Sequence, residues 1–307
     1  MLHPKTPGIP WPAVALLAVT VACAGDAPVE DAPLSAAPPG PAMGEGTWTT
    51  LDGNAVPYSV AGRADADVTV VFVHCWMCNK SFWDAQLPAL AGVYRTVTFD
   101  MPGHGEATSE RDQWTVAGYG ADVAGLIREL GLTDIVLVGH SMGGPVSLRA
   151  AALLPGIVRG IVAVDTLHDA EFRFEGDQIE AMMQAFETDF VGTCGQFVAQ
   201  MFPEDGVEPI VEQVRAVGCD GARAEVGAAL MRDFATIDSP AWFREAGVPI
   251  RAVNASAPNP TNIEANRAYA DYDAVLMDDV GHYLHMTRPE AFNPLLLNAV
   301  ADIVGAS

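Results

Sequence analysis

One serine in this chain stands where it could act as a nucleophile. It lies in Gly139-His140-Ser141-Met142-Gly143, a G-x-S-x-G pattern, with the apolar run 135–138 before it and a helix-like stretch after it. A sharp strand-to-helix turn of this kind lifts the serine hydroxyl away from the backbone, and the glycines let neighbouring chain pass closely. The helix that follows would direct free N–H groups at a negative charge above Ser141. The pattern therefore predicts a nucleophile elbow rather than a purely structural turn.

A serine hydroxyl becomes a good nucleophile only when a base removes its proton. The best candidate base is His282, which follows Gly281 shortly after the apolar run 273–277. If that run is the last strand of a parallel sheet, its loop emerges at the same sheet edge as Ser141. His285 is the fallback base. The remaining histidines near these motifs are expected to be structural, and they are His74, His104 and His140.

Acyl transfer also needs N–H donors aimed at the oxygen that becomes negatively charged. The backbone N–H of Met142, at the start of the predicted elbow helix, is one candidate. The other is expected in the loop after the apolar run 68–73, which reads His74-Cys75-Trp76. We assign this second donor to the backbone N–H of Trp76.

The spacing of apolar residues places these motifs on alternating strands and helices. Short apolar runs indicate buried parallel strands, and apolar residues at helical spacing indicate the helices between them. The predicted strands are 47–51, 56–60, 68–73, 95–99, 135–138, 161–164, 250–253 and 273–277. The predicted helices are 81–90, 114–130, one after the elbow, and 294–304. The alternation stops between about 166 and 247, where helical patterns dominate, so we expect an inserted helical lid there.

Taken in chain order, these motifs resemble the α/β-hydrolase fold of lid-bearing esterases, lipases and aminopeptidases. The matching segments are Val73-His74-Cys75-Trp76, Asp100-Met101-Pro102-Gly103-His104-Gly105, Gly139-His140-Ser141-Met142-Gly143-Gly144 and Gly281-His282. The resemblance covers about 47–304. It implies an α/β architecture with a mostly parallel sheet, helices on both faces and an inserted helical lid. It also implies a serine hydrolase that acts on a small-molecule acyl substrate without a cofactor or a metal.

Two positions depart from the pattern of that family. Cys75 stands where the family usually has a glycine after the loop histidine. The family's triad acid usually follows the strand 250–253, but the loop 254–262 contains no carboxylate. Glu264 is the first acid beyond that loop and lies too far along. Some members place the acid after the preceding strand, which makes Asp165 the expected third member of the triad. The alternative is that Asp165 only caps the turn into the lid.

The leading interpretation is a serine-dependent hydrolase that cleaves a small or medium ester through an acyl-enzyme. One alternative is an amide-cleaving aminopeptidase, which would need acids in the lid to hold a free amine. The candidates for that role are Glu171, Glu175 and Asp177. A second alternative is a catalytically inactive binding protein that keeps the fold. The acid-free loop 254–262 favours it, and the presence of both Ser141 and His282 argues against it.

The N-terminal segment resembles a bacterial lipoprotein signal. A weakly positive start precedes a mostly apolar stretch, 11–22, and small residues precede Cys23. The resemblance implies removal of 1–22 and a lipid on Cys23, with ordinary secretion as the alternative. The Pro-, Ala- and Gly-rich segment 23–46 is expected to be a disordered tether. We therefore expect a domain anchored by lipid in the bacterial cell envelope and facing the periplasm, with Ala24 weakly favouring the outer membrane.

The remaining cysteines lie within the predicted fold. Cys75 and Cys78 form a C-x-x-C that lacks the sequence context of a redox or zinc site. Cys194 and Cys219 both lie in the predicted lid, where an oxidising compartment would permit a disulfide.

Composition limits the classes of partner. Half of the 307 residues are apolar, which is enough for a sizeable core. The formal net charge is −23, and such a surface repels both a nucleic-acid backbone and anionic lipids. We expect no nucleic-acid partner, and contact with a membrane only through the N-terminal lipid.

Overall fold

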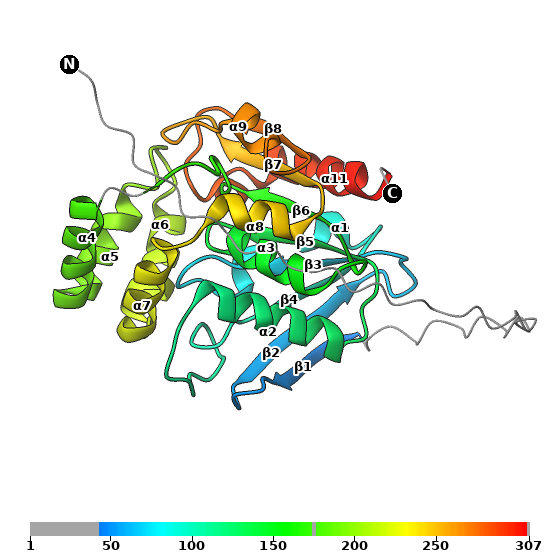
Figure 1. Ribbon diagram of the computed structural model, residues 1–307, viewed down its shortest axis with the longest axis horizontal. Helices are drawn as coiled ribbons and strands as arrows, with labels where there is room; N and C mark the ends of the chain where they lie inside the picture. The colour runs from blue at the N-terminus through cyan, green and yellow to red at the C-terminus, as the bar shows by residue number, and fades with distance from the viewer. Residues whose placement is uncertain (1–42, 174–175, 306–307) are drawn as a thin grey trace, which may run out of the picture. The chain divides into compact units, whose positions relative to one another are not determined.

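An eight-stranded sheet forms the centre of the computed structural model, which describes residues 43–173 and 176–305. The strand order is β1-β2-β4-β3-β5-β6-β7-β8 (Figure 1). β2 pairs antiparallel with both of its neighbours, and all pairs from β4 to β8 are parallel. The strands are β1 (Gly44–Thr49), β2 (Ala55–Gly62), β3 (Thr69–Val73), β4 (Arg95–Phe99), β5 (Ile135–His140), β6 (Val158–Val164), β7 (Ile250–Ala255) and β8 (Tyr272–Met277). This sheet, with its helices, confirms the predicted fold class.

Side chains that alternate along the central strands lie in two separate hydrophobic cores. Val71 and Val73 of β3 lie in one core, and Val70 and Phe72 of the same strand lie in the other. The helices α2 (Val116–Glu129), α3 (Gly143–Leu153) and α8 (Ser239–Ala246) cover the first face, and α1 (Leu87–Leu90) and α11 (Pro289–Gly305) cover the second (Figure 1). Because both faces are covered, the strands read as continuous apolar runs in the sequence.

Four helices inserted between β6 and α8 form a further layer (Figure 1). They are α4 (Gly176–Thr188), α5 (Phe190–Ala199), α6 (Glu208–Arg215) and α7 (Ala224–Phe234), with a π-helical turn, η2 (Ala216–Asp220), after α6. We call residues 176–234 the helical insertion. A disulfide between Cys194 and Cys219 joins α5 to η2 across a Cα–Cα distance of 5.5 Å.

The helical insertion is shorter than the segment expected to form a lid. The helix α8 falls inside the expected range 166–247 but packs on α3 instead. There Arg149 of α3 forms an ion pair with Glu245 and lies 5.1 Å from the centre of the Trp242 ring. Sequence periodicity could not separate α8 from the insertion, because both are amphipathic helices with the same spacing.

The strand β1 begins inside the segment expected to be a disordered tether. Its first residues pair with β2, with Gly44 opposite Val60 and Glu45 opposite Ser59. The hydroxyl of Ser59 also donates to the Glu45 carboxylate at 2.6 Å. The expectation of disorder was therefore wrong for 44–46, because main-chain pairing with β2 does not require an apolar pattern in the sequence.

The other predicted N-terminal features lie outside the described residues. These are the signal peptide 1–22, the lipid site Cys23 and the tether as far as residue 42. Among the helices that the structure describes, none combines the length and the apolar character needed to cross a membrane.

The helix expected over 81–90 is divided into two short pieces. The first is a 3-10 turn, η1 (Lys80–Trp83), which the Asn79 side chain caps by accepting from the Ser81 N–H at 3.0 Å. The second is α1, with Pro88 in its first turn. Proline cannot donate the hydrogen bond that would continue a preceding helix, so the chain starts a new helix there.

Candidate active site

The elbow between β5 and α3 holds Ser141 in a backbone conformation that non-glycine residues rarely adopt, with φ at +53°. Both flanking glycines are required by close contacts. A Cβ on Gly139 would lie 2.3 Å from the Gly143 carbonyl oxygen, and a Cβ on Gly143 would lie 2.3 Å from the Val73 carbonyl oxygen. The hydroxyl of Thr166 donates to the Ser141 carbonyl at 2.7 Å and so helps to hold the turn in place. The sequence motif thus forms the tight strand-to-helix turn that a nucleophile elbow requires.

Asp165 and His282 are in direct contact, although they are far apart in the sequence. Asp165 directly follows β6, and His282 lies in the loop after β8. The Oδ2 atom of Asp165 is 2.6 Å from Nδ1 of His282. The other carboxylate oxygen accepts from the backbone N–H of Ala255 at 2.8 Å. Asp165 is almost fully buried, whereas the His282 side chain is 20% exposed and lines the same cavity as Ser141.

The electrostatics of this contact favour an ionised carboxylate. Burial alone would raise the pKa of Asp165, but its hydrogen bond with His282, the charge of that ring and the Ala255 N–H together hold the pKa below its ordinary value. Asp165 is therefore ionised at neutral pH and accepts the proton on His282 Nδ1. This leaves Nε2 of His282 unprotonated and able to accept a proton from a hydroxyl group.

The other acids and amides considered from the sequence do not contact His282. Glu264 is exposed in the first turn of the short helix α9 (Ile263–Arg267). Asn254 is fully buried, and its amide contacts the ring of His168 at 3.3 Å. The fallback base His285 is also fully buried, and its ring packs 4.8 Å from the Trp83 ring rather than lining the cavity.

The loop that carries His282 is fixed by groups on both sides. The Nε2–H of His140, in the elbow, donates to the His282 carbonyl at 2.8 Å. On the other side the insertion supplies acceptors: the Met201 carbonyl accepts from the His282 N–H at 2.9 Å, and Glu204 Oε1 accepts from the Gly281 N–H at 2.8 Å. No local pattern indicates a role for Glu204, because its partners lie in a segment that is distant along the chain.

The two residues expected to supply oxyanion donors line the same cavity as Ser141. Met142 and Trp76 both line the cavity that contains Ser141, and Met142 stands at the N-terminal end of α3. The indole N–H of Trp76 donates to the Gly227 carbonyl of α7 at 2.9 Å, and its ring lies 5.4 Å from that of Phe186. The helical insertion therefore holds this loop through its tryptophan side chain.

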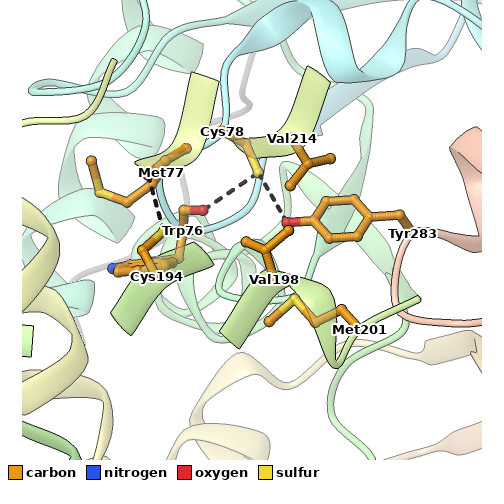
Figure 2. A pocket seen from close by; sticks show the side chains of 9 residues that line it. Trp76, Met77, Cys78, Cys194, Val198, Met201, Val214 and Tyr283 are labelled. Carbon is orange, nitrogen blue, oxygen red and sulfur yellow. Dashed lines mark hydrogen bonds between the residues drawn. The ribbon is translucent and has the colours of Figure 1, made fainter. Parts of the chain in front are cut away.

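A disulfide between Cys75 and Cys78 closes the same loop around Trp76. Figure 2 shows Cys78 facing both Trp76 and Tyr283, with 3.9 Å between Cys78 Sγ and the Tyr283 hydroxyl. The loop is also held by His74, whose Nδ1–H donates to the Cys75 carbonyl at 2.9 Å while its Nε2 accepts from a backbone N–H. The cysteine that replaces the usual glycine is thus part of a covalent closure of the loop.

A cavity of about 650 Å³ opens above Ser141 and His282. Its wall on the side of the insertion and α8 is largely apolar and includes Met182, Phe197, Leu230, Met231, Phe234 and Phe243. Other lining residues are polar, among them Thr166, His168, Asp169, Arg173 and Asn259. Within residues 43–173 and 176–305, no three His, Cys, Asp or Glu side chains are grouped so that they could hold a metal ion.

Known proteins that are similar to this chain identify its family. The model of the alpha/beta hydrolase family matches residues 70–295. The 2-(acetamidomethylene)succinate hydrolase of Mesorhizobium japonicum is 26% identical over 253 residues, covering 77% of this chain and 88% of its own length. The non-heme chloroperoxidase of Streptomyces lividans is 26% identical over 277 residues, covering 82% of this chain and 98% of its own.

Solved structures show the same fold. A thermophilic esterase from Thermogutta terrifontis superposes with a TM-score of 0.72 at 22% identity, covering 84% of this chain and 98% of its own. The resemblance inferred from the motifs is therefore confirmed at the level of the fold. Because the family model also matches well over half of the chain, the protein belongs to the alpha/beta hydrolase family.

Proposed function

We propose that this protein is a serine-dependent hydrolase that cleaves a small or medium ester through an acyl-enzyme intermediate. The observation that carries the proposal is the 2.6 Å contact between Asp165 and His282 at a cavity that also contains Ser141. An ionised acid, a base with a free Nε2 and a serine on a strained elbow are the three groups that acyl transfer requires.

Each group has a defined role in the proposed reaction. His282 Nε2 takes the proton of the Ser141 hydroxyl as its oxygen attacks the ester carbonyl carbon. The imidazolium that forms is stabilised by the Asp165 carboxylate. The backbone N–H groups of Met142 and Trp76 donate to the carbonyl oxygen as it becomes negative. His282 then protonates the departing alcohol, and it activates a water molecule that hydrolyses the acyl-enzyme and restores Ser141.

The cavity supports an uncharged ester with an apolar group rather than a highly charged substrate. A volume of about 650 Å³ falls in the range of small-molecule sites, roughly 300–1,000 Å³. The apolar wall would bury a hydrocarbon or aromatic group, at about 25 cal/mol for each Å² removed from water. We therefore expect aryl and medium-chain acyl esters to react faster than acetate esters of the same alcohol.

Two measurements on the purified protein test the proposal. A fluorophosphonate probe should label the wild type but not Ser141→Ala, and a series of p-nitrophenyl esters should be hydrolysed by the wild type alone. His282→Ala should lose hydrolysis by several orders of magnitude. If the folded wild type neither reacts with the probe nor hydrolyses any ester of the series, the interpretation as a binding protein replaces this one.

The amide-cleaving alternative has less support. Among its candidate acids, Glu171 is exposed and accepts a hydrogen bond from the Tyr269 hydroxyl at 2.6 Å, outside the cavity. Glu175 and the side chain of Asp177 lie outside the described residues. Parallel assays with the p-nitrophenyl ester and p-nitroanilide of the same acyl group decide between the two, and we expect the ester to be preferred.

We further propose that the mature chain begins at Cys23, carries lipid there and faces the periplasm from a bacterial membrane. Support comes from the small residues before Cys23 and from the Pro- and Ala-rich segment that follows it. Mass spectrometry of the mature N-terminus tests this. A lipid-free N-terminus at another residue would favour secretion instead.

A further inference from the structure

Two histidines, not one, flank the carboxylate of Asp165. His282 contacts Oδ2, while Nε2 of His168 lies 3.6 Å from Oδ1. That distance is longer than a direct hydrogen bond but short enough for a ring N–H to act electrostatically on the carboxylate. His168 is 19% exposed and lines the cavity, yet nothing in the proposed reaction uses it.

The hydrogen-bond partners of His168 determine where its ring proton lies. The Asn254 amide is oriented by Thr166, because Oδ1 of Asn254 accepts from the Thr166 N–H and Nδ2 donates to the Thr166 carbonyl, both at 3.2 Å. One N–H of Asn254 Nδ2 is thus used by the Thr166 carbonyl. The other is shared between the Thr261 hydroxyl at 3.0 Å and His168 Nδ1 at 3.3 Å.

This orientation makes Nδ1 of His168 an acceptor. Because the Thr261 hydroxyl already accepts from Asn254, its own proton is free to be donated to His168 Nδ1, 3.1 Å away. A neutral imidazole that accepts at Nδ1 carries its proton on Nε2. The Nε2–H of His168 then faces the Asp165 carboxylate.

The backbone beneath His168 is held as firmly as its ring. Asn266, which is fully buried on α9, donates to the carbonyls of both Leu167 and His168 at 3.0 Å. The Asn262 N–H also donates to the His168 carbonyl, at 2.8 Å. These contacts fix the main chain at His168 and so limit the positions that its ring can take.

We propose that His168 is a positioning residue of the triad, which holds and polarises Asp165 from the side opposite His282. The inference rests on the proposed function. In the proposed arrangement, Asn254 and Thr261 set the His168 tautomer. The Nε2–H of His168 then holds Asp165 Oδ1 in place. Asp165 Oδ2 in turn orients His282. The end of β7 and the loop after it, which carry no carboxylate, thereby contribute to catalysis through the Asn254 amide and the Thr261 hydroxyl.

Burial is the largest influence on the pKa of His168 and lowers it. The charge of His282 lowers this pKa further, whereas the charge of Asp165 raises it, and the net shift is downward. The ring is therefore neutral at neutral pH, as the arrangement requires. Two more charged groups, Asp169 and Arg173, line the same cavity. They are unchanged in the variants below, so their effect on the pH profile is common to all of them.

The test compares His168→Leu with His168→Gln, whose amide N–H can reach the place of Nε2. We expect His168→Leu to lower kcat for a p-nitrophenyl ester by roughly tenfold, the effect of a triad that is no longer held in its reactive geometry. We expect KM to stay within about twofold. His168→Gln should recover most of the lost kcat.

The pH profile separates positioning from a general loss of structure. In His168→Leu the Ala255 N–H is the remaining donor to Oδ1. More of the Asp165 charge then faces His282, so the acid limb of kcat/KM should move to higher pH. Thr261→Val should shift it in the same direction, whereas Thr193→Val, which removes a hydroxyl bonded only within the insertion at 3.0 Å, should not.

Nitrogen-15 NMR of the histidine side chains gives a readout that does not depend on turnover. The wild type should show His168 protonated at Nε2, and the His282 Nδ1–H resonance should shift in His168→Leu. If His168→Leu keeps wild-type kcat, or if only the melting temperature falls while the pH profile and the His282 resonance stay unchanged, the proposal is overturned. An inactive wild type with the expected NMR tautomer would refute the proposed function but not the positioning.

Discussion

The ring of His140 donates a hydrogen bond of 2.8 Å to the main-chain carbonyl of His282. The residue before Ser141 therefore holds the loop of His282, the proposed base. A carbonyl can only accept, so the His140 proton lies on Nε2. Burial and the neighbouring histidines keep the pKa of His140 well below its ordinary value, which leaves the ring neutral and the link unchanged over the working pH range.

Glu204 should hold the same base loop from the insertion. Its Oε1 accepts from the Gly281 N–H at 2.8 Å and from the Thr287 hydroxyl at 3.0 Å. We expect Glu204→Ala to lower kcat/KM by roughly tenfold, because a small displacement of His282 has a large effect on proton transfer. Glu204→Gln keeps an acceptor oxygen and should retain most activity.

The control for this experiment is Glu212→Ala, an exposed residue of α6 in the same insertion. It should behave like the wild type. Equal ester kinetics for Glu204→Ala and Glu212→Ala would show that Glu204 is not needed to hold the base.

Asp165→Asn should lower turnover far more than any other acid-to-amide change near the site. An asparagine that presents its amide N–H to His282 Nδ1 favours the wrong tautomer, and the analogous loss in a well-studied triad is about 10⁴ in kcat. The matched control is Glu264→Gln, which removes an exposed carboxylate on α9. Both kcat and the melting temperature are measured for the two variants. Equal losses of kcat in Asp165→Asn and Glu264→Gln would contradict the role of Asp165.

The two disulfides should have different effects when removed. The Cys75–Cys78 bridge has a sequence separation of 3 and closes the loop around Trp76. The double variant Cys75→Ser/Cys78→Ser should therefore lower kcat by at least about tenfold. The upper limit is the roughly 10²–10³-fold loss in kcat that follows removal of one oxyanion donor. The Cys194–Cys219 bridge has a sequence separation of 25, for which chain entropy predicts a stabilisation of about 3 kcal/mol.

Cys194→Ser/Cys219→Ser is thus the matched control for the first pair. It should lose mainly stability, measured by urea unfolding, whereas the first pair should lose mainly kcat. Full esterase activity in Cys75→Ser/Cys78→Ser would show that the loop keeps its geometry without the bridge.

Mild acid should destabilise the fold through its buried histidines. Burial lowers the pKa of His74 to about 4 and the pKa values of His104 and His285 to about 3. Below pH ~6.5 the unfolded chain takes up protons that these folded rings cannot, so the free energy of unfolding falls as pH falls, by at most ~1.4 kcal/mol per pH unit for each ring. Asp122 acts in the opposite direction, because burial raises its pKa to about 6.

Urea unfolding between pH 7 and pH 5 measures this slope. We expect stability to be highest near neutrality and to decline with acid, with a smaller decline in His285→Phe. No hydrogen-bond partner is recorded for either ring nitrogen of His285 in the described part of the chain, so this variant should not lose stability at neutral pH. A flat profile would mean that the buried rings are protonated in the fold.

The sheet, the elbow at Ser141 and the contact between Asp165 and His282 could be predicted because each has a local signature. The elbow needs two glycines around Ser141, His282 follows a glycine after the last strand, and Asp165 follows a strand that ends at the same sheet edge. The order of parallel strands then brings their carboxyl ends together. These predictions used only local pattern and chain order.

The groups that hold the triad could not be predicted in this way. His168 depends on Asn254 and Asn266, and Glu204 depends on Gly281, all of them far away in the sequence. A histidine or glutamate in a helical or loop segment has no local feature that identifies its distant partner. The division between α8 and the insertion was missed for the same reason, because it depends on what each helix packs against.

The position of the acid has a consequence for how this protein could acquire new substrates. With Asp165 after β6, the loop after β7 does not carry the acid of the triad, and Pro258, Asn259 and Pro260 of that loop line the cavity. Changes at these three positions can alter selectivity while the charge that orients His282 stays in place. These three positions can therefore diversify while Asp165 and Thr261, the residues proposed to orient His282 and to set the His168 tautomer, stay unchanged.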